Sequence, residues 1–555
     1  MTNFLRIIGK EYNFRQYLVI FLCIYLFALV AGFLLQGAGT LFDVRSLLIS
    51  VALVILILGM ICHPLDKIFC FWAMIAIIFL IFIFPRIMMY MLTPAIVTFP
   101  FGKDINRTTV FIGLTYVLLG MASLAIGQLL YEKFMSKMFV SGTMASNSAS
   151  FCQLPLLAIV FLIFLIIQIY ISCGLGISPY LLNARMSTFW ANTFVQLICV
   201  IIDADMLLLI CFITILGRSD LSKTSRWSFA IGIATCYLFA SAYLGSRGGS
   251  MRLLIILLAV LLACYGNFRV SIYRILCVMS LLMVIGWVSF PFATMQRMKS
   301  VAMYNTAAQE LVDDKAKEDI EAKAKFKELF IIKAKKRVEE SLLAETAENI
   351  TTILNNNLIM ALINSKHILD RIGVLDYAIL VVTQSANTEC KKRIMTIDYT
   401  FKSLINSVPG TPFPEAELNT SRLVSALFRP ETPESYLKVS GYHSEPYTAW
   451  GLSFLFFGWW GGLLALGIVG AVLVALQDIS RIGQWNIYRK ALFFWIMPSI
   501  VILSMGVDHS IFLVFVEYLR LTVALIILFA LTALVSSRTD ALMLKWRKSS
   551  GITRN

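Results

Sequence analysis

The chain has 555 residues, of which 59% are hydrophobic and only 14% are charged, and its formal net charge is +15. Soluble globular proteins have roughly 25% charged residues, so this composition excludes an ordinary soluble domain. The basic residues lie mostly in short segments between apolar runs, as membrane topology requires. The positive charge therefore does not indicate nucleic-acid binding.

The first apolar run, residues 17–36, follows Arg6, Lys10 and Arg15, and no small-residue cleavage pattern comes after it. We expect it to remain as the first span. A helix of about 20 residues crosses a hydrocarbon core of about 30 Å, and a helix satisfies every backbone polar group in lipid. The sequence predicts an all-α polytopic membrane protein with about twelve spans, at residues 17–36, 45–62, 67–84, 108–130, 151–172, 190–216, 227–244, 251–266, 271–292, 449–476, 488–505 and 511–535.

The distribution of lysine and arginine predicts the orientation. With the N-terminus in the cytoplasm, the inside segments hold 19 of these residues and the short outside loops hold 7, Arg86 among them. This positive-inside bias places both termini in the cytoplasm. The expected organisation is a membrane domain over 1–292 with nine spans, a large periplasmic insert over 293–448, and three further spans with a cytoplasmic tail over 449–555.

The insert is expected to be mainly helical. Residues 304–349 are rich in mixed charges, and apolar side chains recur there every four residues from Phe326 to Leu342, which predicts an amphipathic helix. A solvated helix on its own domain and a partner-binding or membrane-surface helix both fit that pattern. Residues 353–382 are expected to form a helix docked against the membrane domain. Residues 387–447 contain several prolines and are expected to form loops with short helices.

Common catalytic motifs do not occur in the sequence. It contains no GxxxxGK[ST] phosphate loop, so it does not encode an ATP-driven pump of that type. It also contains no HExxH motif and no Cys/His cluster with zinc spacing. We expect neither a metal nor a cofactor.

Arginines on the predicted outer side are the first candidates for a site. Arg247 and Arg252 lie in the turn Gly245-Ser-Arg-Gly-Gly-Ser-Met-Arg252. Arginine binds phosphate groups bidentately, and glycines leave backbone N–H groups open, so this turn predicts an anion site. A tight hairpin whose arginines reach the lipid head groups is the alternative. Arg185, after the fifth span, could face the same place.

The insert contributes the other candidates. Arg371 and Asp376 lie about a turn and a half of helix apart, and Arg422 follows in a later loop. His443 and Glu445 directly precede the tenth span, so they are held near the membrane surface. A histidine or carboxylate there can act as a general base toward a hydroxyl, whereas loop packing and surface charge are the structural alternative.

Four segments give the chain a resemblance to a known family. They are Gly245-Ser-Arg-Gly-Gly249, Arg371-Ile-Gly-Val-Leu-Asp-Tyr377, His443-Ser-Glu-Pro-Tyr-Thr-Ala-Trp-Gly451 and Gly458-Trp-Trp-Gly-Gly462. With about twelve spans and a long late outer loop, the chain resembles Wzy-type polymerases of oligosaccharide repeat units, which make O-antigens and exopolysaccharides. The charged helix over 304–349 is longer than this family leads one to expect.

The resemblance implies a GT-C-like glycosyltransferase in the bacterial inner membrane. Its substrates would be undecaprenyl-diphosphate-linked oligosaccharides, with membrane lipids around it and with a chain-length regulator and a flippase as further partners. Positive charge stabilises a diphosphate leaving group, a role that Arg185, Arg247, Arg252, Arg371 and Arg422 could fill. The attacking hydroxyl needs a base, and the candidates are His443, Glu445 and Asp376.

Three other classes remain open. A ligase of the same fold would transfer the finished glycan to another acceptor. A transporter or flippase of lipid-linked glycans would favour broken helices and charges near the bilayer midplane, such as Asp203 and Asp205. A non-catalytic assembly protein would use the insert as a docking arm.

Overall fold

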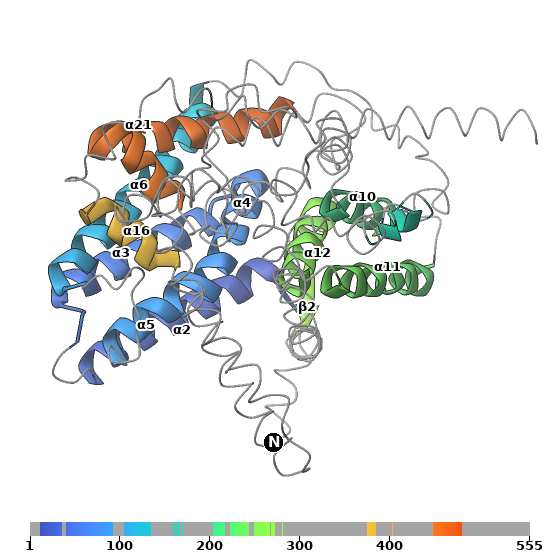
Figure 1. Ribbon diagram of the computed structural model, residues 1–555, viewed down its shortest axis with the longest axis horizontal. Coiled ribbons are helices and arrows are strands. Elements are labelled where there is room, and N and C mark those ends of the chain that lie inside the picture. The colour runs from blue at the N-terminus through green and yellow to red at the C-terminus, as the bar shows by residue number, and fades with distance from the viewer. Residues whose placement is uncertain are drawn as a thin grey trace, which may run out of the picture.

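The protein is mostly helical in a computed structural model (Figure 1). The structure describes residues 11–35, 40–92, 105–134, 204–216, 222–243, 249–266, 268–271, 374–384 and 448–479, together with residues 159, 161–163, 165–166, 169, 280 and 402. Within these ranges, five helices are long and apolar enough to cross a membrane: Phe14–Leu35, Val44–Ile61, Ile68–Leu92, Arg107–Phe134 and Phe457–Ala475. These helices confirm the prediction of a multi-pass helical membrane protein.

Much of the expected architecture lies outside the described residues. This applies to the expected spans over 488–505 and 511–535 and to the charged helix over 304–349, and the expected span over 271–292 is described only at residues 271 and 280. The span over 151–172 is described only at seven scattered positions between 159 and 169, and that over 190–216 only from residue 204.

The N-terminal third forms a helical bundle. Helices α2 (Phe14–Leu35), α3 (Val44–Ile61) and α4 (Asp66–Ile78) run one after another, and α3 packs against both of its neighbours and against α6 (Arg107–Phe134). The Asp43 side chain caps α3 by accepting a hydrogen bond from the backbone N–H of Ser46 at 2.8 Å. Inside the bundle, the indole N–H of Trp72 donates to Gln128 Oε1 at 2.8 Å. This buried bond links α4 to α6.

Helix α4 does not end at residue 84, where the sequence predicted the end of a span. It continues through η1, a π-helical segment over Phe79–Ile83, into α5 (Phe84–Leu92). A proline in a helix lacks the N–H and conflicts with the carbonyl one turn earlier. The wider π-helical turn lies at that place before Pro85, and the helix passes the proline. The prediction that Arg86 lies in a short outer loop is therefore wrong, because Arg86 is inside α5 and is 1% exposed.

The helix α21 (Ala449–Ile479) is broken at Gly458, where φ is 68° and ψ is −162°. The two arms fold back on each other, because a Cβ added to Gly462 would lie 2.8 Å from the carbonyl oxygen of Ser453, nine residues earlier. The rings of Phe454 and Trp459, one on each arm, lie 6.1 Å apart. The Thr448 hydroxyl accepts from the Gly451 N–H at 3.0 Å, so the first arm begins at a buried cap.

A second group of helices consists of α10 (Ala204–Leu216), α11 (Lys223–Tyr243) and α12 (Gly249–Tyr265), which pack on one another. In Figure 1 this group lies well apart from α16 and α6. A short antiparallel ribbon pairs β1 (Glu11–Asn13) with β2 (Arg269–Ser271), with Tyr12 opposite Val270. The ribbon ties the beginning of α2 to the end of α12.

Candidate functional site

The candidate site is built around α16 (Val374–Gln384), which comes from the region expected to form the insert. It packs against α6, α21 and η1, and most of its described side chains are buried. A Cβ on Gly113 would lie 2.5 Å from Ile379 Cγ1 and 2.9 Å from Ile379 Cα, so the glycine lets α16 approach α6 closely. This contact confirms docking against the membrane domain for residues 374–382. Residues 353–373 of the same prediction lie outside the described ranges.

A charged network holds α16 to α5. The guanidinium of Arg86 donates from Nε to Asp376 Oδ1 at 2.9 Å and from Nη2 to Asp376 Oδ2. The hydroxyl of Tyr90, one turn after Arg86, also donates to Asp376 Oδ1. Arginine and carboxylate thus meet in the two-pronged arrangement that gives the strongest charge-assisted hydrogen bonds.

All three members of this network are removed from solvent. Arg86 is 1% exposed, and Tyr90 and Asp376 are 0% exposed. Charges inside a membrane domain are costly, and they usually pair with each other and belong to functional regions. Removing one partner of such a pair is strongly destabilising, because the other charge remains buried without compensation. The network therefore fixes the position of α16 in the bundle.

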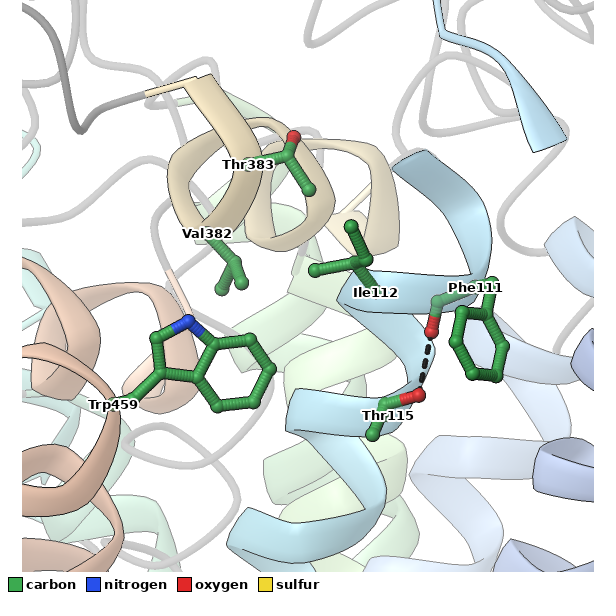
Figure 2. A pocket seen from close by; sticks show the side chains of 6 residues that line it. All are labelled: Phe111, Ile112, Thr115, Val382, Thr383 and Trp459. Carbon is green, nitrogen blue, oxygen red and sulfur yellow. Dashed lines mark hydrogen bonds between the residues drawn. The ribbon is translucent and has the colours of Figure 1, made fainter. Parts of the chain in front are cut away.

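A groove opens at the other end of α16. It has a volume of about 350 Å³ and is lined by Phe111, Ile112, Thr115, Val382, Thr383 and Trp459. Figure 2 shows Trp459 on one side, Phe111 and Thr115 on the other, and Ile112 between them beneath the end of α16. The groove thus lies where α6, α16 and the second arm of α21 meet.

The two hydroxyl groups that line the groove already donate hydrogen bonds within their own helices. Thr115 donates its hydroxyl to the carbonyl of Phe111 at 2.7 Å, and Thr383 donates to that of Ile379 at 2.7 Å. The hydroxyl protons therefore point back into the helices rather than into the groove. The lining is suited to a hydrocarbon rather than to a sugar, whose hydroxyls need hydrogen-bond partners.

The comparisons with known proteins leave this geometry without a counterpart. No family model matches the chain, and no curated protein or solved structure is similar to it at a significant level.

Two of the predicted site residues are described, and they lie in different places. Asp376 is in the network with Arg86 and Tyr90. Arg252 is half-buried on α12, which packs mainly against α10 and α11 and lies well apart from α16 in Figure 1. The other predicted residues lie outside the described ranges: Arg185, Arg247, Arg371, Arg422, His443 and Glu445.

Asp376 has a clear structural environment. Both of its carboxylate oxygens accept hydrogen bonds from side chains of α5, so in this arrangement it positions a helix. Its role as a general base stays a prediction, as do those of His443 and Glu445, which lie outside the described ranges. The described residues contain no group of three or more His, Cys, Asp or Glu that could hold a metal ion.

The sequence reasoning missed Arg86 and Tyr90. One signal was available, because an arginine followed by Ile-Met-Met-Tyr-Met-Leu lies in a run that stays apolar to Leu92. A single arginine within an apolar run predicts an intramembrane partner. The identity of that partner, 290 residues away, could not be read from the sequence.

Proposed function

We propose that this chain is a Wzy-type polymerase that joins lipid-linked oligosaccharide repeat units at the periplasmic face of the bacterial inner membrane. The observation that carries the proposal is the docking of α16, from the long segment between the membrane helices, into the bundle against α6 and α21. Such docking suits an enzyme that works on one face of the membrane.

The proposed topology has twelve spans, with both termini in the cytoplasm and residues 293–448 in the periplasm. The charge count supports it better once Arg86 is removed from the outer loops, because 7 − 1 leaves six basic residues outside against 19 inside. A cysteine introduced at position 340 should react with an impermeant maleimide in intact spheroplasts. Reaction only after lysis would contradict this orientation.

The proposed reaction needs no nucleotide, because the donor glycan is already activated as a diphosphate. A hydroxyl of the acceptor repeat unit attacks the anomeric carbon of the donor sugar, and His443 or Glu445 takes its proton. The bond from the anomeric carbon to the diphosphate oxygen breaks, and undecaprenyl diphosphate leaves. Its developing charge is stabilised by arginines, for which the candidates are Arg185, Arg247, Arg252, Arg371 and Arg422.

The test is a glycan ladder from cells that depend on this chain for long surface polysaccharide. Arg422→Ala and His443→Ala should abolish long chains while the protein still inserts at normal abundance. Lys133→Gln, which removes a positive charge from the last turn of α6, is the matched control and should leave the ladder unchanged. Normal ladders from both site variants would reject the assignment of the site.

A transporter or flippase of the same lipids is the second candidate, and one observation favours it. The helix α21 is broken at Gly458 and begins at a buried cap, and discontinuous helices with buried ends are typical of transporter sites. Proteoliposomes holding a fluorescent lipid-linked repeat unit separate the two candidates. A polymerase releases polyprenyl diphosphate and lengthens the glycan, whereas a flippase moves the label between leaflets without forming a bond.

A further inference from the structure

The groove beside α16 is joined to a positively charged rim at the beginning of α6. Residues 107, 111 and 115 follow one another at four-residue spacing, so they lie along one face of the helix. Arg107 stands at the first position of α6, and the other two residues line the groove. The Arg45 guanidinium lies over the ring of Phe111, with its central carbon 4.9 Å from the ring centre.

The two arginines of this rim differ in how their charge is compensated. Arg45 pairs with Asp43 at 2.8 Å, so together they add no net charge. Arg107 donates from Nε to the backbone carbonyl of Thr40 at 2.8 Å, which is a neutral acceptor. Among the residues that the structure describes, no carboxylate forms an ion pair with Arg107. Its exposed guanidinium therefore offers two uncompensated nitrogens to an anion.

The groove also opens toward the lipid-facing side of the molecule. Ile112 lies on the same face of α6 as Leu119 and Ile126, seven and fourteen residues later, which are 38% and 55% exposed. On α21, Trp460 and Leu464 are 82% and 67% exposed. Large apolar side chains with this exposure on membrane-spanning helices face hydrocarbon, so a chain from the bilayer can enter the groove sideways.

The position of the rim matches the depth of a lipid head group. A helix of 28 residues such as α6 is about 42 Å long at 1.5 Å per residue, and the hydrocarbon core is about 30 Å thick. Arg107, at the first residue, therefore lies at the level of the head groups. The beginning of a helix also favours anions. Tryptophan, the residue at positions 459 and 460, is enriched at the level of the head groups.

We propose that the groove holds one acyl chain of an anionic phospholipid of the surrounding bilayer, with its phosphate bound by Arg107. The volume of about 350 Å³ lies near the lower limit for ligand pockets, which run from about 300 to 1,000 Å³. That volume suits one hydrocarbon chain better than a long polyprenyl tail. The lipid covers the seam between α6 and α16 and keeps water from it. This inference does not depend on the proposed function.

The experiment measures lipid retention by the purified full-length chain in native mass spectrometry. Phosphatidylglycerol and phosphatidylcholine with identical acyl chains are offered in equal amounts, and polyprenyl phosphate is offered in a separate arm. The wild-type chain should retain phosphatidylglycerol preferentially. Arg107→Gln, whose amide can still donate to Thr40, should lower this preference about tenfold. Lys133→Gln, at the opposite end of α6, should leave it unchanged.

A second variant tests the acyl chain separately from the phosphate. Thr383→Phe fills the groove and should reduce retention of both phospholipids, while the melting temperature shows that the chain is still folded. Equal retention of the two phospholipids by the wild-type chain, or an unchanged preference in Arg107→Gln, would overturn the proposal. Strong displacement of phosphatidylglycerol by polyprenyl phosphate would also overturn it, because the groove would then belong to a polyprenyl ligand.

Discussion

Two seams meet at the centre of this bundle, and they are held in opposite ways. The seam between α5 and α16 depends on a buried arginine, tyrosine and aspartate. The seam between α6 and α21 depends on glycines: Gly127 lies against the backbone of Gly467, and Gly470 lies against that of Leu124. Helices in lipid gain little from the hydrophobic effect, so they need either close backbone approach or polar pairing. This protein uses one solution at each seam.

The difference has a consequence for function. A seam of close-packed backbones tolerates no added atom but carries no charge, so it serves as a fixed frame. The charged seam is costly to build and adds little net stability over an apolar one, but it specifies a single position for α16. The helix that lines the groove, α16, is thus the one fixed by the more specific device.

The largest effect is expected from breaking the charged seam on one side. Asp376→Ala leaves the buried guanidinium of Arg86 without its carboxylate, and Arg86→Ala leaves the carboxylate of Asp376 without its guanidinium, so each should lower the free energy of unfolding by about 3–5 kcal/mol. Melting temperatures of the detergent-purified chain measure this directly. Tyr90→Phe removes one hydrogen bond to the carboxylate and should cost about 1.5–3 kcal/mol.

The double variant Arg86→Met with Asp376→Leu is the control for this assignment. Replacing both members by apolar side chains leaves no buried charge, so most of the lost stability should return. If the double variant loses as much free energy of unfolding as the two single variants lose together, the Arg86–Asp376 pair is not the source of their instability.

The glycine seam gives the next effect. A Cβ on Gly127 would run into the backbone carbonyl of Gly467, which cannot rotate away. Gly127→Ala should therefore cost about 1–3 kcal/mol through overpacking. Gly59→Ala is the matched control on another spanning helix, since nothing lies within 4 Å of its added Cβ. It should stabilise the chain by about 0.5–1 kcal/mol, and an equal loss at both positions would contradict the packing argument.

A substitution at the break in α21 should cause a loss of stability similar to that of Gly127→Ala. At φ 68° and ψ −162°, Gly458 occupies backbone space that is essentially restricted to glycine. Gly458→Ala should therefore cost about 1–3 kcal/mol, although nothing lies within 4 Å of the added Cβ. If its melting temperature matched that of the wild type, the reversal of the chain at this residue would be refuted.

The sequence alone predicts some of this helix arrangement but not the rest. Long apolar runs predicted the spanning helices, because lipid leaves a backbone few alternatives. They did not predict the length of the third span, because Pro85 and Arg86 together are typical of a span end. Glycines at 113, 120 and 127 recur every seven residues and indicate a packing face of α6, but not its partner. The pairing of Arg86 with Asp376 depends on tertiary structure across 290 residues.

The smallest effect on stability is expected at His63, a titratable side chain that water can reach, in contrast to the buried network of Arg86, Tyr90 and Asp376. His63 lies between α3 and α4, and its Nδ1 accepts a hydrogen bond from the Leu65 N–H at 3.3 Å. Burial, followed by the positive charge of Arg15, lowers the pKa of His63 below its ordinary value of 6.5. The folded chain therefore binds fewer protons at this residue than the unfolded chain does. Its contribution to stability is present above pH 6.5 and is lost as the pH falls through the lowered pKa.

Protonation at Nδ1 also removes the acceptor of the Leu65 bond, so the turn between α3 and α4 should loosen on acidification. The melting temperature of the wild-type chain should fall between pH 7 and pH 5 by more than that of His63→Asn, which does not titrate there. The difference should be small beside the loss in Asp376→Ala, because half-exposed charges near water are screened. A fall that is identical in His63→Asn would assign the acid sensitivity to other groups, and a fall as large as that caused by Asp376→Ala would remove the contrast between buried and open charge.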